Sequence, residues 1–216
     1  MPHWVGMSVV KFSRRSFVVL GVLMASLVSL NACSSGPSAP DEGAYVQEIA
    51  EHRAGIERAF REEEDPIPPD MREKLLPLPY YGVDASYAVP AALKLADERP
   101  VFEMPTSTGK RRRMQRVGVL EFTLQGQPMT LGAFVEEGQQ IVNLFVPFAD
   151  TTTGAETYPA GRYLELHPTS TGFYTVDFNK AYNPYCAYNK TYDCPFPPPS
   201  NRLKVAIRAG EKAPAA

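Results

Sequence analysis

The residues with the greatest potential for binding or chemistry lie between Asp150 and Arg202. This stretch holds most of the tyrosines and two of the three cysteines, together with many amide and carboxylate side chains. An arginine among tyrosines and asparagines is suited to holding a carboxylate or phosphate group of a small ligand. The candidate ligand-binding residues are Tyr158, Arg162, Asp177, Asn179, Asn183 and Arg202.

Arg162 is expected to face inward from a strand over residues 162–166, because alternation places it on the same side as the two leucines of that strand. A buried guanidinium needs a carboxylate partner. Asp177 is the first candidate for this partner, and Asp150 and Glu156 are alternatives. In one interpretation the pair is buried and pins a loop to the sheet. In the other, Arg162 binds a carboxylate or phosphate group of a ligand. The opposite face of the strand would carry Tyr163, Glu165 and His167.

Proline and asparagine give the same stretch a purely structural interpretation. Asn183-Pro184 and the prolines at 195–199 impose a stiff and irregular path on the chain. Such a path forms few ladder hydrogen bonds, so nearby side chains would bond to its backbone. The side chains expected to do so are Asp177, Asn179, Asn183 and Asn201. The tyrosines at 182–192 could stack on a ligand or cover a small core.

Cys186 and Cys194 predict a disulfide, because they lie close together in a loop that would face an oxidising compartment. No metal site is expected, since their spacing is not Cys-x₂-Cys and the only histidines downstream of the signal are His52 and His167. No cofactor is expected either, because the sequence lacks a dinucleotide fingerprint and a phosphate-binding loop.

Enzyme motifs such as G-x-S-x-G and H-E-x-x-H are missing from the sequence. A hydrolase would therefore have to rely on acid–base side chains. The candidates for that role are Asp150, Glu156, Asp177 and His167.

Three short segments carry a family resemblance. They are Asp150-x-Thr152-x-Gly154-x-Glu156-Thr157-Tyr158-x-x-Gly161-Arg162-Tyr163-Leu164, Val176-Asp177-Phe178-Asn179-x-Ala181-Tyr182-Asn183-Pro184-x-Cys186-Ala187 and Cys194-Pro195-x-Pro197-Pro198-Pro199-x-Asn201-Arg202-Leu203. These segments closely resemble the bacterial family catalogued as domain of unknown function 1684, and a weaker resemblance extends through residues 104–109 and 118–122. The resemblance identifies the domain but implies no activity. Ser200 departs from the family pattern, in which glutamate commonly precedes Asn-Arg, so any chemistry of that glutamate is missing here.

The first 32 residues predict an export signal. Ser13-Arg14-Arg15-Ser16-Phe17 has the twin-arginine pattern, and the apolar run after it is too short to span a membrane. The run ends in Leu30-Asn31-Ala32-Cys33, which resembles the lipobox of bacterial lipoproteins. We therefore expect a lipid on Cys33 and a flexible tether at residues 33–41, with cleavage by an ordinary signal peptidase as the alternative. The protein would be anchored in the cell envelope at the outer face of a membrane, on its periplasmic or extracellular side.

The charge balance of the chain does not suggest a nucleic-acid partner. The signal contains three basic residues and no acidic ones, so the mature chain would carry 19 basic against 24 acidic residues. The one basic cluster is Lys110-Arg111-Arg112-Arg113 with Arg116. It would either contact anionic lipid head groups or protect a strand edge from pairing with other chains.

Hydrophobic periodicity predicts one helix followed by short strands. Tyr45, Ile49, Ile56 and Phe60 recur at helical spacing, which predicts an amphipathic helix over residues 42–64. From residue 87 the period becomes two, with strands predicted at 87–95, 101–105, 114–124, 129–135, 141–148, 162–166 and 175–178. Residues 42–212 would form one globular domain, mainly β with an N-terminal helix, in which an antiparallel meander closes as a sandwich or barrel.

These observations favour a lipid-anchored protein that binds a small ligand or an envelope partner. The alternatives are an envelope hydrolase and a purely structural envelope protein. The geometry of Arg162 distinguishes them. Full pairing within the fold favours a structural role, whereas an opening into a concave site beside a free carboxylate favours an enzyme.

Overall fold

The computed structural model describes residues 41–63, 66–167, 169, 171 and 173–215. The predicted signal, the proposed lipidation residue Cys33 and the tether up to residue 40 lie outside this part of the chain and stay predictions. Within the described residues, no helix combines the length and the apolar character that a membrane crossing requires.

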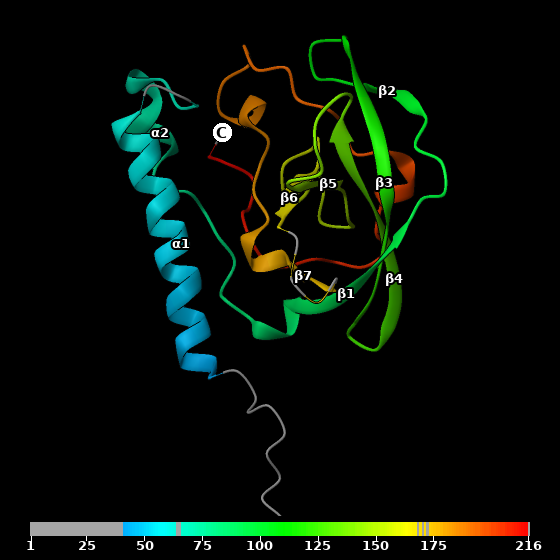
Figure 1. Cartoon of the computed structure of the whole chain (residues 1–216). Coiled ribbons are helices and arrows are strands. Elements are labelled where there is room, and N and C mark those ends of the chain that lie inside the picture. Colours follow the sequence, from blue (N-terminus) through cyan, green and yellow to red (C-terminus); the bar gives the residue numbers. More distant parts are fainter. Residues whose placement is uncertain (1–40, 64–65, 168, 170, 172, 216) are drawn as a thin grey trace, which may run out of the picture. The chain divides into compact units, whose positions relative to one another are not determined.

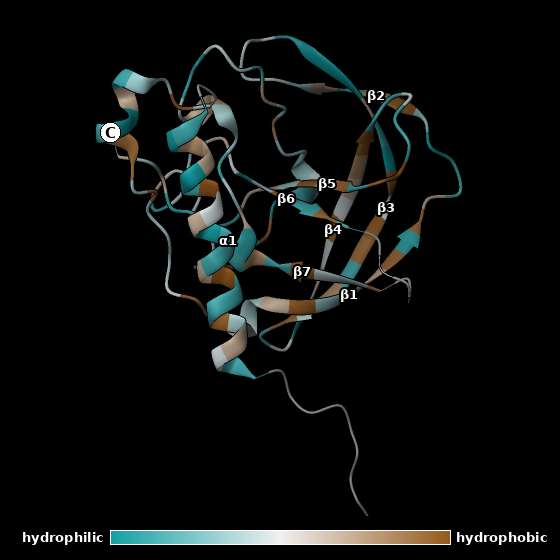
Figure 2. Cartoon of the chain, turned by 60° about the vertical axis from the view of Figure 1, so that its left-hand side comes forward, coloured by the Kyte–Doolittle hydropathy of each residue, from teal (hydrophilic) through white to brown (hydrophobic). Residues whose placement is uncertain are grey.

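The helix α1 spans Glu42–Glu62, close to the predicted range. The Asp41 carboxylate accepts a hydrogen bond from the Gly43 N–H and caps its first turn. The helix buries the face that carries Ile49 and Phe60, and Figure 2 shows hydrophilic and hydrophobic residues alternating around it. Pro66 is among the residues that prevent the helix from continuing.

Seven antiparallel strands form one curled sheet in the order β6-β5-β4-β3-β1-β7, with β2 paired to β3 outside this path (Figure 1). The strands are β1 Ala88–Leu95, β2 Val101–Pro105, β3 Arg111–Leu124, β4 Gln127–Glu136, β5 Leu144–Phe148, β6 Arg162–Leu166 and β7 Phe173–Asp177. The predicted fold class is confirmed: the domain is mainly β, and the antiparallel sheet curls into a half-barrel beside one N-terminal helix.

The strand β3 begins earlier than predicted because it serves two partners in succession. Its first half pairs with β2 and its second half with β1, and its register against β4 shifts between Arg116 and Gly118. A Cβ atom on Gly118 would lie 2.3 Å from the Lys94 carbonyl oxygen. Only glycine therefore allows the backbone of β1 to approach at this bulge.

The main core fills one side of the sheet and includes the C-terminal segment through Leu203, Ile207 and Ala209. A second cluster joins α1 to the short helix α2, Arg72–Leu75, through Phe60, Leu75 and neighbouring residues. The remaining helical turns are η1 Pro69–Met71, η2 Ala85–Tyr87, η3 Phe178–Lys180, η4 Tyr185–Ala187 and η5 Pro199–Asn201.

The edge strands β6 and β7 lie near each other, but no ladder joins them among the described residues. The chain after β7 crosses toward β6, where Tyr163 and Tyr182 exchange backbone hydrogen bonds of 2.8 and 3.1 Å. The helix α1 packs against η2 and η3, which flank β1 and β7. Side chains from α1, β6 and β7 therefore meet at this seam of the half-barrel.

Candidate functional site

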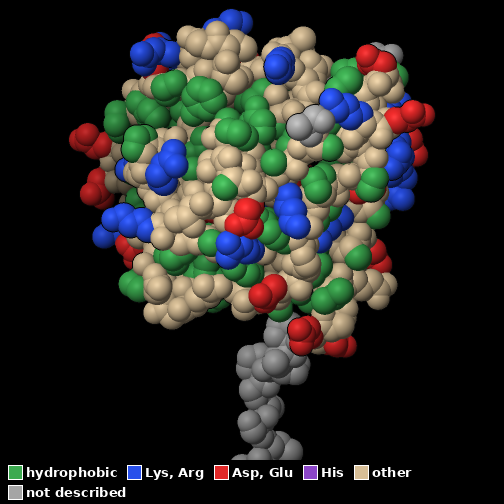
Figure 3. Space-filling model, turned by 180° about the vertical axis from the view of Figure 1, so that it is seen from behind, with side chains coloured by type: hydrophobic (Ala, Val, Ile, Leu, Met, Phe, Trp, Pro, Cys, Tyr) green, Lys and Arg blue, Asp and Glu red, His purple; other side chains and the backbone are tan. Residues whose placement is uncertain are grey.

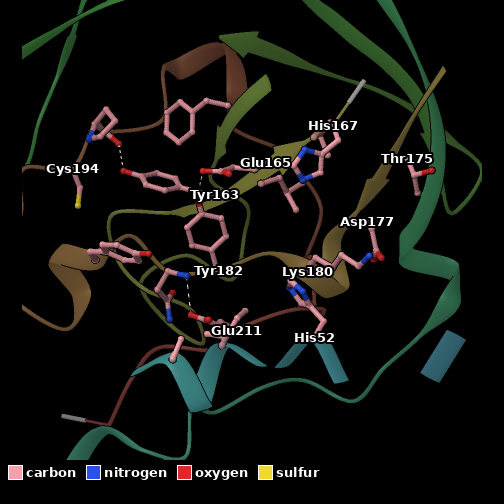
Figure 4. Close-up of a pocket in the computed structure, with 18 of the residues that line it drawn as sticks. His52, Tyr163, Glu165, His167, Thr175, Asp177, Lys180, Tyr182, Cys194 and Glu211 are labelled. Atoms are coloured by element: carbon pink, nitrogen blue, oxygen red, sulfur yellow. Dashed lines mark hydrogen bonds between the residues drawn. The ribbon is translucent and has the colours of Figure 1, made fainter. Parts of the chain in front are cut away.

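A cleft of about 1300 Å³ opens between α1, β6, the end of β7 and the segment at residues 182–195. Figure 4 shows labelled side chains from several of these elements converging on it. Because the sheet is curled and its edges do not pair, residues far apart in sequence line one space.

The strand β6 supplies one wall of the cleft through Tyr163, Glu165 and His167, the face that alternation had set opposite to Arg162. The Glu165 carboxylate accepts a hydrogen bond from the Tyr182 hydroxyl at 3.1 Å. The His167 ring donates from Nδ1 to the Asn143 amide oxygen at 2.6 Å. These two side chains are exposed, so they can be reached from solvent.

The helix α1 supplies the facing wall through Tyr45, Glu48 and His52. Glu48 forms an ion pair with Lys180 of η3 at 2.6 Å. The pKa of His52 is lowered, first by partial burial of the ring and then by the positive charge of Lys180. His52 therefore favours its neutral form, in which one ring nitrogen accepts a hydrogen bond.

Asp177 lies at the end of β7, where the cleft meets α1. Its carboxylate accepts hydrogen bonds from the Tyr45 hydroxyl at 2.8 Å and from the Asn179 backbone N–H at 3.0 Å. Burial and then the bond to Asp177 raise the pKa of Tyr45 well above its ordinary value, so the phenol stays protonated as the donor.

Glu211 is the most deeply buried carboxylate of the cleft, with 1% of its surface exposed. It accepts hydrogen bonds from the Asn183 backbone N–H at 2.8 Å, from Tyr80 at 3.4 Å and from the Tyr188 hydroxyl. Burial raises its pKa to about 7, against the opposing effects of these donors and of Arg162. A carboxyl group with this pKa can hold or release a proton near neutral pH.

Arg162 is buried, as predicted, but it does not reach a ligand site. Its guanidinium donates to the carbonyl oxygens of Ile207, Ala209 and Glu211 and forms an ion pair with Asp150 at 2.9 Å. The pairing predicted with Asp177 is therefore wrong, and the alternative partner Asp150 is correct. The pair holds the C-terminal segment that carries Glu211. Because both terminal nitrogens of the guanidinium are used within the fold, the geometry of Arg162 favours a structural role for this residue, and the case for ligand binding rests on the cleft instead.

Two asparagines likewise fix irregular segments of the chain: Asn179 bonds to the backbone of Asp84, just before η2, whereas Asn201, in η5, ties its own segment to strands β4 and β5. Asn179 donates to the Asp84 carbonyl at 2.8 Å and accepts from its N–H at 3.1 Å. Asn201 accepts from the Gly132 N–H at 2.7 Å and donates to the carbonyls of Gly132 and Pro147 at 2.8 Å. These bonds explain why amide side chains are frequent in a region with few ladder bonds.

Among the six candidate ligand-binding residues, Asp177 and Asn183 line the cleft. Tyr158 does not line it and donates its hydroxyl to the Cys186 carbonyl oxygen at 3.4 Å, and Arg202 is exposed beside η5. The side chains of Arg162 and Asn179 bind partners within the fold. The cleft also includes Tyr182, one of the tyrosines expected either to stack on a ligand or to cover a small core. It adds residues that the sequence reasoning did not select as ligand-binding: His52, Glu165, Lys180 and Glu211.

Alternation could have identified Glu165, because it shares a face with His167. Glu211 gave no such signal, since an isolated glutamate near the end of a chain has no distinctive pattern.

The predicted disulfide is wrong: Cys186 and Cys194 are free and buried. The Cys186 N–H donates to the Cys194 sulfur at 3.2 Å. The pKa of Cys186 is lowered to about 6, chiefly by a hydrogen bond from the Cys194 thiol, and the pKa of Cys194 is raised by the same bond. In the described part of the chain, no group of three or more His, Cys, Asp and Glu side chains is arranged to hold a metal ion.

The four acid–base candidates of the hydrolase hypothesis are not assembled in one place. Asp177 and His167 line the cleft. Asp150 forms the buried ion pair with Arg162, and Glu156 forms an ion pair with Arg208 at 2.7 Å outside the cleft.

The three arginines of the basic cluster at 111–113 form ion pairs with acids on or next to neighbouring strands. Arg112 binds Glu136 at 3.1 Å, and Arg113 binds Glu137 at 2.8 Å. Because β3 pairs with β2 on one side and with β4 on the other, the cluster does not lie on an edge strand, and the expected protection of a strand edge is wrong. On the face shown in Figure 3, basic and acidic side chains are interspersed. Contact of the cluster with lipid head groups stays a prediction.

Comparisons with known proteins agree with the resemblance. The model of a family described as "Protein of unknown function (DUF1684)" matches residues 74–212, which include every strand and Glu211 but not α1. A solution NMR structure of an uncharacterized protein from Haloarcula marismortui is 38% identical, with a TM-score of 0.63. That match covers 80% of this chain and 96% of the other. A comparison with curated proteins gives no match.

Proposed function

We propose, from the premise that this chain belongs to the DUF1684 family of proteins of unknown function, that it is an exported, lipid-anchored protein whose cleft binds a small ligand. The observation that carries the proposal is the cleft of about 1300 Å³, which is large enough for a small molecule and is lined by both apolar and polar groups. Asp177 and Asn183 keep the ligand-binding role expected from the sequence, and Glu165, His167 and Glu211 join them.

The burial of polar groups around the cleft supports a binding role. Burying a carboxylate such as Glu211 is costly for folding. The fold nevertheless places it at the cleft and holds its segment with the buried Arg162–Asp150 pair.

The anchor and the location rest on the N-terminal sequence. The twin-arginine pattern and the segment before Cys33 support export and acylation, and the tether would leave the domain free beside the membrane. The partners proposed are therefore the membrane, through the lipid, and a small molecule or an envelope component that enters the cleft.

Native mass spectrometry of the full-length protein purified from its own membranes tests both parts. We expect a mass that shows cleavage before Cys33 with added acyl chains, and a second species that retains a ligand. An unmodified Cys33 would overturn the anchor.

A matched pair of variants tests the cleft. Thr175→Trp places a large ring on an exposed position of β7 that lines the cleft, whereas Thr123→Trp places the same ring on an exposed position of β3 outside it. Retained ligand should be lost from the first variant and kept by the second. Equal retention by both variants, or no ligand in the wild type under any condition, would refute binding in the cleft.

The hydrolase remains a second candidate because Asp177 and His167 line the same cleft as His52. A neutral histidine near carboxylates can act as a general base. A retained molecule that is released in chemically altered form by the wild type, but unaltered by His52→Gln or His167→Gln, would favour this alternative over simple binding.

A further inference from the structure

We infer that the ligand carries an organic cation, a primary ammonium or guanidinium group, which binds in the cleft beside Glu211, Asn183 and Glu165. The inference rests on the proposed function and adds the chemical class of the ligand. Two independent observations support it: a set of carboxylates without cationic partners and a buried acceptor without a hydrogen bond.

Charge in the cleft is unbalanced. Among the residues that the structure describes, six carboxylates line it, but only two permanently charged cations do. Both cations already have acidic partners: Lys180 pairs with Glu48 at 2.6 Å, and Arg112 pairs with Glu136 at 3.1 Å. The carboxylates lining the cleft are Glu48, Glu136, Glu165, Asp177, Asp193 and Glu211.

Three of these carboxylates, Glu165, Asp177 and Glu211, form no ion pair within the described part of the chain. Their hydrogen-bond donors are neutral tyrosine hydroxyls, amides and backbone N–H groups. Arg162 lowers the pKa of Glu211 from a distance, but its charge is committed to Asp150. An added cation would therefore be attracted by Glu165 and Asp177 and by the ionised form of Glu211, while an anion would be repelled.

Asn183 provides the second observation. It is 1% exposed and lines the cleft, and its side-chain Oδ1 has no hydrogen-bond partner among the described residues. Its amide nitrogen is already used, donating to the Lys212 carbonyl at 2.8 Å. A buried acceptor left unpaired is costly, so the site calls for a donor. Ammonium and guanidinium groups have donors and no acceptor.

Position strengthens this argument, because the free acceptor and the most buried carboxylate belong to one small region. The Asn183 backbone N–H binds Glu211 at 2.8 Å, and the next residue upstream, Tyr182, donates its hydroxyl to Glu165. Figure 4 shows Tyr182 between Glu165 and Glu211. Aromatic rings such as those of Tyr163 and Phe145 also line the cleft and can stack on a cation or pack against its carbon chain.

Titration with three small molecules of similar length tests the inference. Putrescine carries two ammonium groups, succinate carries two carboxylates, and butanediol is neutral. We expect putrescine alone to shift the NMR amide signals of residues 163–167 and 182–183 in a saturable way. The Thr175→Trp variant should lose this response.

Charge-removing variants locate the cation. Glu165→Gln should weaken putrescine binding roughly fivefold, because one partly exposed charge is removed. Glu211→Gln should weaken it more, by about tenfold or greater, because its charge is buried. Glu121→Gln, an exposed glutamate on β3 outside the cleft, should bind as the wild type does. Since Glu165 is exposed, its substitution does not threaten folding and keeps the test decisive.

The outcomes separate the inference from the proposed function. Binding of succinate or butanediol in place of putrescine, or unchanged putrescine affinity in both glutamate variants, would overturn the cationic ligand and leave the cleft as a binding site. Absence of binding by all three molecules, together with no retained ligand from native membranes, would overturn both.

Discussion

The buried carboxyl group of Glu211 makes the stability of this domain depend on pH in a way that one substitution should remove. In the fold its pKa is raised from 4.5 to about 7, chiefly by burial. The difference corresponds to about 3 kcal/mol between the two protonation states. Because the folded form holds this proton more tightly than the unfolded chain does, the associated stability is fully present below about pH 4.5 and is lost as the pH rises through about 7. Glu211→Gln keeps the shape of the side chain and has no proton to lose.

Urea unfolding of the wild type and of Glu211→Gln, followed by circular dichroism from about pH 4.5 to pH 8, measures this dependence. We expect the free energy of unfolding of the wild type to fall by about 3 kcal/mol relative to the variant across this range. Any constant cost of the new amide cancels in the comparison, and so do the titrations of all other groups. Glu121→Gln serves as the exposed control and should run parallel to the wild type. Parallel curves for Glu211→Gln as well would show that the carboxyl group is not titrating in a buried site.

Three further predictions concern the scaffold around the cleft. Arg162→Met should lower the free energy of unfolding by about 3–5 kcal/mol in urea unfolding, because it leaves a buried carboxylate and three carbonyl groups without their partner. Arg208→Met removes an exposed ion pair and should leave the free energy of unfolding nearly unchanged. Similar losses in both variants would contradict the proposed role of Arg162 in holding the C-terminal segment. Gly118→Ala should prevent the close approach of β1 and strongly lower the melting temperature. Gly55→Ala, on α1 at a position where an added Cβ has no neighbour within 4 Å, should raise stability by about 0.5–1 kcal/mol. An unchanged melting temperature for Gly118→Ala would refute the bulge argument. Because Cys186 and Cys194 are free, a reductant should not change the melting temperature. Alkylation under denaturing conditions without reductant should label both cysteines. A melting temperature that drops with reductant would instead support the disulfide predicted from the sequence.

The sequence predicted most of the fold because its signals are local. The alternation of apolar residues from 87 onward identified every strand, and the spacing of Ile49 and Phe60 identified α1. The boundaries that moved have tertiary causes. The strand β3 starts at Arg111 because β2 pairs with that segment, while β5 starts only at Leu144 because the preceding residues form the turn from β4.

The candidate site was harder to predict because charge partners depend on distances between segments. Arg162 was expected to be buried and paired, and it is, but its partner is Asp150 rather than Asp177. A strand pattern gives the face on which a side chain lies, but it cannot show which of several carboxylates that face will meet. The same limit applies to the two cysteines, whose spacing suggested a bond that the loop geometry does not form.

By itself, the sequence determined the fold class, the inward arginine and the amide side chains that hold irregular backbone, because each follows from residue type and short-range periodicity. The export and lipid-anchor predictions also rest on sequence alone. Only the tertiary structure decided that β6, β7, α1 and the C-terminal segment enclose one cleft. It also decided that Glu211 and Asn183 meet there, because the curl of the sheet and the Arg162–Asp150 pair bring together residues that no local pattern connects.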